Sequence, residues 1–262
     1  MIKESVVLPS LGIPYNLGRT TISVRPLTTR AYKDFIVTAS DEGVQNLVDS
    51  CLVDCPLKSE ELVYQDLLAV YIKIRTISIG TKIPVYSNCP HCSSKNKDEW
   101  DLMKLECSYL NIDKYPFPIT LPESKEQIYL SIPTSLSQKI AKEEAQKRAT
   151  QFNKKLSDFL PSFQVASLIN TSEDLVGRVD WYTNLPLKDA IFIDQALDQL
   201  QDFGVHTIRL IECPECKKEY SMPLQINTDF FRPSIGSIEG IKISKGTLEK
   251  GPSDPDETKQ DS

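Results

Sequence analysis

The sequence predicts an α+β fold built around two β-hairpins, which together form a split four-cysteine zinc ribbon. Three observations predict this fold. Two Cys-Pro-X-Cys turns occur far apart in the chain, at 89–92 and 213–216. Strand-like segments precede and follow each turn. The N-terminal region and the long insertion between the turns carry mainly helical patterns.

We divide the chain at the points where these patterns change. The predicted units are an extended N-terminal arm at 1–30, a helical region at 31–82, zinc-ribbon halves at 83–116 and 204–235, a mainly helical insertion at 117–203, and a disordered tail at 245–262. The tail consists mostly of Gly, Pro, Ser and charged residues, which cannot bury enough apolar surface to fold.

The four cysteines of the two turns are the candidate metal ligands. A tetrahedral zinc ion takes thiolates at about 2.3 Å, and one Cys-X-X-Cys turn supplies two of them. We therefore expect a structural Zn²⁺ site made by Cys89, Cys92, Cys213 and Cys216. Such turns usually lie about 15–20 residues apart, whereas here residues 93–212 separate them. The site would therefore clamp a whole insertion between its halves.

Other interpretations of the turns remain open at this point. A redox-active protein needs only one Cys-X-X-Cys motif, and this chain has two. Such a motif typically lies in a βαβ unit, and neither turn has that context. Structural disulfides, or no site at all, are further alternatives. His91 lies inside the first turn and could replace a thiolate, although four cysteines already complete a site. Four lysines just beyond the turns would offset the charge of a thiolate-bound zinc: Lys95, Lys97, Lys217 and Lys218.

Three further cysteines, Cys51, Cys55 and Cys107, lie outside the turns. Cys51 and Cys55 are spaced to share one helix face, and no additional ligands accompany them. We predict that Cys51 and Cys55 are core or boundary residues, and that none of the three cysteines is a metal ligand or part of a required disulfide. Free thiols together with a zinc site indicate a reducing compartment.

The charge balance argues against a nucleic-acid or anionic membrane partner. The chain has 262 residues and a net charge of −6, whereas phosphate binding needs clustered Lys and Arg. No stretch approaches the roughly 20 apolar residues of a membrane helix, and no signal peptide is visible. We expect a protein made and kept in a cytoplasm, with no nucleic-acid and no membrane partner.

The first 30 residues allow two structures. Strand-forming residues occupy 6–8 and 21–25, and Pro9 and Gly12 lie between them. An extended arm of this kind can pair with the sheet edge of a partner. Alternatively, it forms a hairpin in the protein's own sheet.

Helical periodicity predicts seven helices, at 31–39, 42–53, 60–77, 138–150, 156–169, 175–182 and 187–203. Asp66 lies in the third, where we expect a solvated or Arg-paired carboxylate rather than a catalytic one. The fourth helix mixes Lys with Glu, which predicts a solvated face rather than a nucleic-acid surface. Alternation predicts a strand at 127–133, and we expect Phe230 and Phe231 in the core.

No catalytic motif is present in the sequence. It lacks the phosphate-binding GxxxxGK[ST], the dinucleotide-binding GxGxxG, the metalloprotease HExxH and the GxSxG of serine hydrolases. A zinc ion held by four thiolates has no open coordination position and does not activate water. We therefore predict no enzyme activity and no small-molecule substrate.

Several short motifs follow one another in a characteristic order: Leu8-Pro-Ser-Leu-Gly12, Arg25-Pro-Leu-Thr-Thr29, Asp66-Leu-Leu, Arg75-Thr-Ile-Ser-Ile-Gly80, the two Cys-Pro-X-Cys turns with Leu187-Lys-Asp189 between them, and Phe230-Phe-Arg-Pro233. This series resembles the baseplate hub and hub-assembly proteins of T-even-like contractile-tailed bacteriophages over most of residues 1–235. The resemblance implies a non-enzymatic structural or assembly component that binds other baseplate or tail hub proteins. It also implies assembly in the bacterial cytoplasm and a place in the virion tail.

A zinc-ribbon protein of transcription or DNA metabolism is the main alternative function. Such a protein should carry a basic stripe with interleaved aromatic residues. The net charge of −6 and the mixed-charge helices disfavour it.

Overall fold

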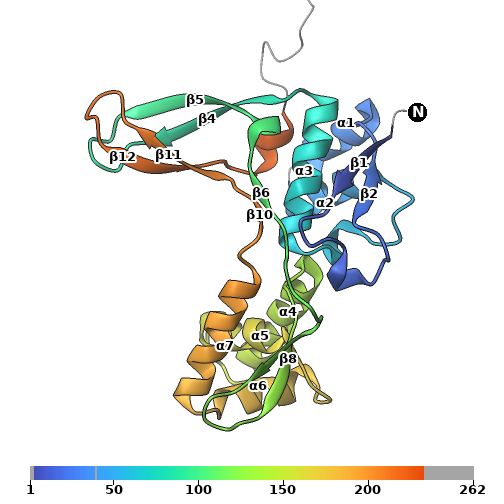
Figure 1. Ribbon diagram of the computed structural model, residues 1–262, viewed down its shortest axis with the longest axis vertical. Coiled ribbons are helices and arrows are strands. Elements are labelled where there is room, and N and C mark those ends of the chain that lie inside the picture. Colours follow the sequence, from blue (N-terminus) through green and yellow to red (C-terminus); the bar gives the residue numbers. More distant parts are fainter. Residues whose placement is uncertain (1–2, 39, 233–262) are drawn as a thin grey trace, which may run out of the picture.

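The computed structural model, which describes residues 3–38 and 40–232, consists of two bodies. They meet at a short strand pair and at contacts of 59–63 with 134–151. Figure 1 shows the first body, with the N-terminal sheet, three helices and two long hairpins, above the insertion. The mixture of helices with small antiparallel sheets confirms the predicted α+β class. The tail predicted at 245–262 lies outside the described residues.

The N-terminal residues form a hairpin in the chain's own sheet. The antiparallel order β1-β2-β3 joins the strands Glu4–Val7, Thr21–Val24 and Leu52–Val53. The inward-facing side chains are almost wholly buried: Val6, Leu8, Ile22 and Val24. Of the two alternatives for residues 1–30, the structure therefore has the internal hairpin, because these apolar side chains fill the first core.

Helix α3 (Tyr64–Ser78) packs on this sheet, and the paired helices α1 (Thr29–Thr38) and α2 (Asp41–Asp49) complete the same core. Helix α3 starts later than predicted because Ser59–Glu61 form a separate 3₁₀ turn, η2. In that turn the Glu61 carboxylate accepts the backbone N–H of Lys58 at 2.8 Å. Leu67, Val70 and Ile74 of α3 are buried, and Gly80 follows the helix with a positive φ of 137°.

Two carboxylates that look like ordinary helix acids are buried. Asp66 accepts hydrogen bonds from the Ser10 backbone N–H at 2.8 Å, from the Ser10 hydroxyl, and from the Tyr15 hydroxyl at 2.8 Å. The expectation of a solvated or Arg-paired Asp66 is therefore wrong: its partners lie in the loop between β1 and β2. Asp189 similarly accepts the backbone N–H groups of Glu123 and Ser124 at 2.7 and 2.9 Å.

Two hairpins extend side by side from the end of α3 (Figure 1). The first pairs β4 (Lys82–Asn88) with β5 (Lys95–Asp101), and the second pairs β11 (Ile208–Glu212) with β12 (Glu219–Pro223). The 3₁₀ turn η3 (Leu102–Lys104) follows the first hairpin, and η5 (Thr228–Phe231) follows the second. Phe230 and Phe231 are buried in the first core, as predicted.

A short antiparallel pair forms the neck between the two bodies. It joins β6 (Cys107–Ser108), which leads into the insertion, to β10 (Gly204–Val205), which leaves it. Gly204 has a φ of +114°, and a Cβ at this position would lie 3.0 Å from the Gln65 side chain. The Gln65 amide in turn donates to the Gln201 carbonyl at 2.9 Å. The neck therefore requires a glycine at 204.

The insertion has a second core between a small sheet and a helix. The sheet has the antiparallel order β7-β8-β9, with bounds Phe117–Thr120, Gln127–Leu130 and Ile169–Asn170. Sequence periodicity predicted the central strand, whereas β7 and β9 were missed. Helix α7 (Leu187–Leu200) covers this core with Ile193, Leu197 and Leu200.

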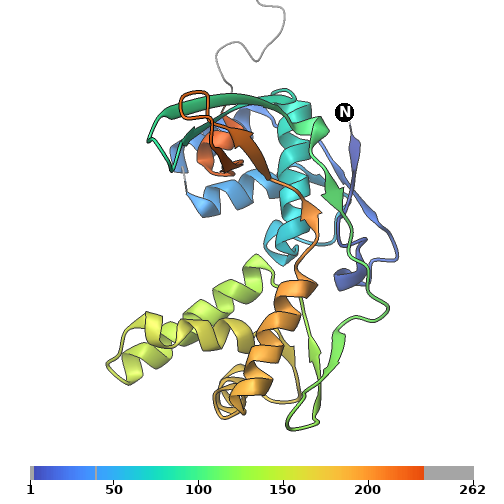
Figure 2. The same ribbon diagram turned by 60° about the vertical axis from the view of Figure 1, so that its left-hand side comes forward.

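The remaining helices of the insertion were all predicted. They are α4 (Ser135–Gln151), α5 (Leu160–Ala166) and α6 (Leu175–Thr183), with the 3₁₀ turn η4 (Leu156–Asp158) before α5. Figure 2 shows α4 and α5 side by side, projecting together toward one side of the molecule. The buried face of α4 consists of Ala141, Ala145 and Ala149, so the partner helices approach closely while the Lys and Glu residues face outward.

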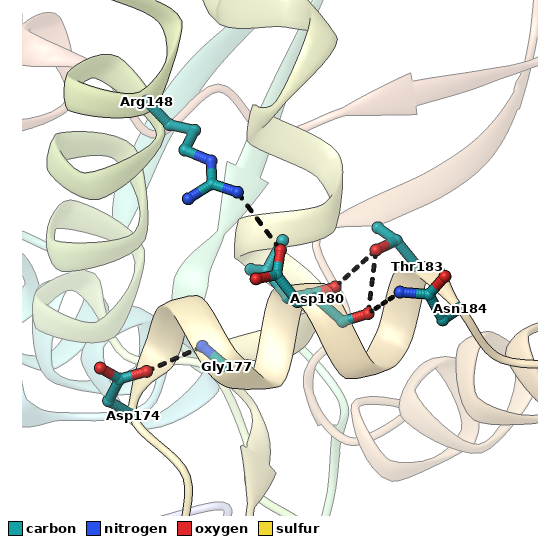
Figure 3. Close-up of polar contacts among 7 residues, drawn as sticks. Arg148, Asp174, Gly177, Asp180, Thr183 and Asn184 are labelled. Carbon is teal, nitrogen blue, oxygen red and sulfur yellow. Dashed lines mark hydrogen bonds and ion pairs between the residues drawn. The ribbon is translucent and has the colours of Figure 1, made fainter. Parts of the chain in front are cut away.

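One ion pair links α6 to α4, and two local hydrogen bonds cap the ends of α6 (Figure 3). The Asp174 carboxylate caps α6 by accepting the Gly177 backbone N–H at 2.7 Å. Arg148 of α4 lies 3.4 Å from the Asp180 carboxylate of α6. At the end of α6, the Asn184 side chain donates to the Asp180 carbonyl at 2.7 Å.

Within the part of the chain that the structure describes, every helix is too short or too polar to cross a membrane.

Candidate metal-binding site

The two Cys-Pro-X-Cys turns have the same backbone conformation at the tips of the two hairpins. In the first, the Cys89 N–H donates to the Ser94 carbonyl and the Ser93 N–H donates to the Cys89 carbonyl, both at 2.9 Å. In the second, the Cys213 N–H donates to the Lys218 carbonyl at 3.0 Å and the Lys217 N–H to the Cys213 carbonyl at 2.9 Å.

Each turn also has one residue in the left-handed backbone conformation, at the equivalent position. Ser93 and Lys217, each four positions after the first cysteine of its turn, both have a φ of 59°. Each turn therefore presents its two thiols from one tight loop. The match arises because the same Cys-Pro-X-Cys spacing closes a six-residue loop between paired strands in both hairpins.

The turns bring together the four predicted cysteines, whose sulfur atoms all lie within 4.8 Å of one another. The Sγ atoms of Cys89 and Cys216 are 3.7 Å apart, and those of Cys92 and Cys213 are also 3.7 Å apart. A disulfide bond would need about 2.05 Å. Bonds of about 2.3 Å to one tetrahedral ion place sulfur atoms about 3.8 Å apart. The observed spacing fits shared coordination of an ion and excludes direct sulfur–sulfur bonds.

Hydrogen-bond donors surround the sulfur atoms. The Ser94 hydroxyl lies 3.2 Å from the Sγ of Cys213, and the Asn96 side-chain amide donates to the same sulfur at 3.7 Å. The His91 backbone N–H donates to the Cys89 sulfur at 3.4 Å. Such donors stabilise thiolates, which are the form that binds a metal.

Protonation differs among the four thiols. The backbone N–H of Cys216 and the Ser94 hydroxyl lower the pKa of Cys213 to about 5. Ser94, through its side chain and backbone, also lowers the pKa of Cys92. Against a hydrogen bond from the Lys218 backbone N–H, burial and the neighbouring thiols raise the pKa of Cys216 to about 11. The low pKa values of Cys213 and Cys92 favour metal binding at neutral pH, whereas Cys216 must lose its proton on binding.

Contacts beside the cluster hold the two hairpins together. The Asn96 amide donates to the Tyr220 phenolic oxygen at 2.7 Å, and that oxygen is 2.8 Å from the Ser87 hydroxyl. The Arg209 guanidinium of β11 lies over the Trp100 ring of β5, 4.6 Å from its centroid. The sulfur atoms are therefore positioned by a preformed interface.

The other residues considered from the sequence lie elsewhere or have other partners. Cys51, Cys55 and Cys107 are outside the group of four. The His91 ring lies 3.3 Å from the Glu219 carbonyl oxygen. Of the flanking lysines, Lys97 lies over the Tyr86 ring and Lys217 is 3.9 Å from the Glu212 carboxylate.

Sequence reasoning missed Ser94 and Asn96, the polar residues that contact the sulfur atoms. They lie two and four positions after Cys92, and the second turn has Lys218 and Tyr220 at the matching positions. The available signal was that small polar residues occupy these positions in the first turn, whereas Lys and Tyr occupy them in the second. Its meaning depends on the second hairpin lying alongside, which the sequence does not reveal.

Together these features define an α+β protein in which two hairpin tips form a four-thiol cluster capable of holding a metal ion. A family model described as T4 bacteriophage base plate protein matches residues 1–232. The chain belongs to this family, and the resemblance to phage baseplate proteins is confirmed. No curated protein and no solved structure matches it significantly. Membership implies a structural role in tail assembly, contacts with other tail proteins and a location in the virion tail.

Proposed function

We propose that this protein is a non-enzymatic structural or assembly component of the hub region of a contractile-tail baseplate, stabilised by one structural Zn²⁺. The spacing of the four sulfur atoms carries the metal part of the proposal, since two pairs at 3.7 Å match the edges of a zinc–thiolate tetrahedron. Family membership supports the baseplate part, and the resemblance in motif order supports the hub.

Cys89, Cys92, Cys213 and Cys216 would hold the ion. Zinc would supply four bonds that join the hairpin tips and would leave no coordination position for substrate or water. Four thiolates around one Zn²⁺ carry a net charge of −2. The hydrogen bonds from Ser94, Asn96 and the turn amides oppose that charge directly. A closed site of this kind supports assembly rather than catalysis.

The site would control the geometry of the whole molecule. We infer that 83–116 and 204–235 act as the two halves of a zinc ribbon, while 117–203 is an inserted unit. The hairpins lie on one side of the β6–β10 neck and the insertion lies on the other. Joining the hairpin tips therefore limits how the two chain segments of the neck can separate, which gives partner proteins a rigid surface.

The partners would be other baseplate or hub proteins, met during assembly in the host cytoplasm. A direct test is complementation of phage that lack this gene with the wild-type protein or with Cys213→Ser. We expect Cys213→Ser to lose zinc by elemental analysis and to yield few complete tails by electron microscopy. Full tail assembly by a zinc-free protein would refute the structural role of the metal. Absence of the wild-type protein from every tail intermediate would refute the assembly role.

A further inference from the structure

In the part of the chain that the structure describes, the second hairpin has an edge without a strand partner, identified by its hydrogen-bond pattern. At its two ends, the Cys213 N–H donates to the Lys218 carbonyl and the Leu224 N–H to the Thr207 carbonyl. Hydrogen-bonded pairs alternate with non-bonded pairs in an antiparallel hairpin. The backbone groups of every second residue of β11 therefore point away from β12: those of Ile208, Leu210 and Glu212. No other described segment forms a backbone hydrogen bond with these three residues.

The side chains on this edge are apolar and exposed. Ile208 is 63% exposed and Leu210 is 65% exposed, although both lie in a regular strand. An edge of this kind is a template for another strand, and proteins usually protect it with proline or charge. The edge of β11 carries Glu212 only at the hairpin tip.

The other three hairpin edges have this protection. By the same alternation, the outward residues of β12 are Glu219, Ser221 and Pro223. Those of β4 include Lys82 and Pro84, and those of β5 are Lys95, Lys97, Glu99 and Asp101. Within residues 3–38 and 40–232, three of the hairpin edges are thus blocked and one is left apolar and open.

We propose that the outer edge of β11 accepts an extended strand from another tail protein. This proposal rests on the assembly role proposed above and identifies the surface that performs it. The added strand would bond the free backbone groups of Ile208 and Leu210 and place apolar side chains beside theirs. Arg209 points to the opposite face, over Trp100, and has no carboxylate partner among the described residues. An acidic residue between two apolar ones in the partner strand would pair with it.

Arg209 also disfavours a second copy of this chain as the occupant. In a two-fold antiparallel pairing, the register that sets Ile208 against Leu210 of the other copy also sets Arg209 against Arg209. Like charges directly opposite each other destabilise a strand pair. The edge therefore favours a strand from a different chain.

Proline substitutions test the backbone requirement with a matched control. Leu210→Pro removes an N–H that β12 does not use, so the hairpin and its metal should survive. Ser221→Pro makes the same change at the directly opposite residue of β12, on the blocked edge. Both variants should retain wild-type zinc content and melting temperature. In complementation, we expect Leu210→Pro to reduce complete tails at least tenfold and Ser221→Pro to leave their number unchanged.

Crosslinking tests the occupant. A photoreactive amino acid is placed at position 210, and a control variant carries it at position 86, on the β4 edge. Both are irradiated in tail intermediates, and mass spectrometry identifies the crosslinked peptides. The expected product joins position 210 to an apolar–acidic–apolar segment of another tail protein. A crosslink to a second copy, or normal assembly by folded Leu210→Pro, would overturn the proposal. The latter result would leave the baseplate role intact if the protein still enters tail intermediates.

Discussion

Asn96 of the first hairpin donates a hydrogen bond of 2.7 Å to the phenolic oxygen of Tyr220 in the second. The same amide nitrogen lies 3.7 Å from the sulfur of Cys213. Both side chains are buried, and unpaired polar groups in such surroundings are costly. Protein contacts thus join the hairpins beside the thiol cluster, independently of any metal.

Replacing Asn96 by Ala should lower the free energy of unfolding by about 1–3 kcal/mol, because buried partners lose their donor. Urea unfolding of the zinc-loaded protein measures this difference. Ser221→Ala on the exposed face of β12 is the control and should change the same quantity by less than about 0.5 kcal/mol. Equal stability of Asn96→Ala and wild type would show that the hairpin contact is dispensable.

Removing the metal should destabilise the hairpins. A chelator, or Cys213→Ser, should lower the melting temperature and increase proteolysis within 82–101 and 208–223 before cleavage elsewhere. The physical reason is that binding to the folded state alone adds stability, which is lost with the ligand. Limited proteolysis followed by mass spectrometry checks the order of cleavage, and re-addition of Zn²⁺ to the chelated wild type should restore protection. Unchanged cleavage after complete metal removal would contradict this expectation.

The remaining cysteines should not affect metal binding. A variant with Cys51→Ala, Cys55→Ser and Cys107→Ser should retain one zinc per chain, because these residues lie outside the group of four sulfur atoms. Burial raises the pKa values of the Cys51 and Cys107 thiols, which disfavours the metal-binding thiolate form. Elemental analysis decides the matter, and loss of the ion from the triple variant would show a mistaken ligand assignment.

The sequence predicted the elements defined by local patterns better than the contacts between distant ones. The two cysteine turns, their hairpins and the helices of the insertion follow from short-range spacing, and the structure has them. The strands β7 and β9 were missed because short segments show too little alternation. Asp66 is buried against Ser10 and Tyr15, which are distant in sequence. The helical periodicity of α3 alone could not reveal these partners.

The buried Asp66 should make stability depend on pH. Burial raises the pKa of this carboxyl above its ordinary value, against the hydrogen bonds from Ser10 and Tyr15. A raised pKa in the folded state favours the protonated form, so this contribution to stability is present at acid pH and is lost as pH rises through the folded-state pKa. We compare wild type with Asp66→Asn, which cannot ionise.

The expected result is that wild-type stability falls relative to Asp66→Asn as pH increases from about 4 to 7, the range above the unfolded-state pKa. Urea unfolding at several pH values measures the difference. Asp180→Asn is the control, since its 3.4 Å ion pair with Arg148 is partly exposed and should contribute less than about 1 kcal/mol. A pH-independent difference between wild type and Asp66→Asn would contradict the raised pKa.

Deleting residues 2–14 should unfold the first body rather than remove a free arm. Leu8 is fully buried and Val6 is 6% exposed, and both belong to the first core. The deletion also removes Ser10, so Asp66 would lose two of its three hydrogen bonds. Substitutions separate these effects. Leu8→Ala should cost about 2–5 kcal/mol, whereas Val7→Ala, at a side chain 48% exposed, should cost far less. A truncated protein that melted cooperatively at the wild-type temperature would show that this hairpin is peripheral to the core.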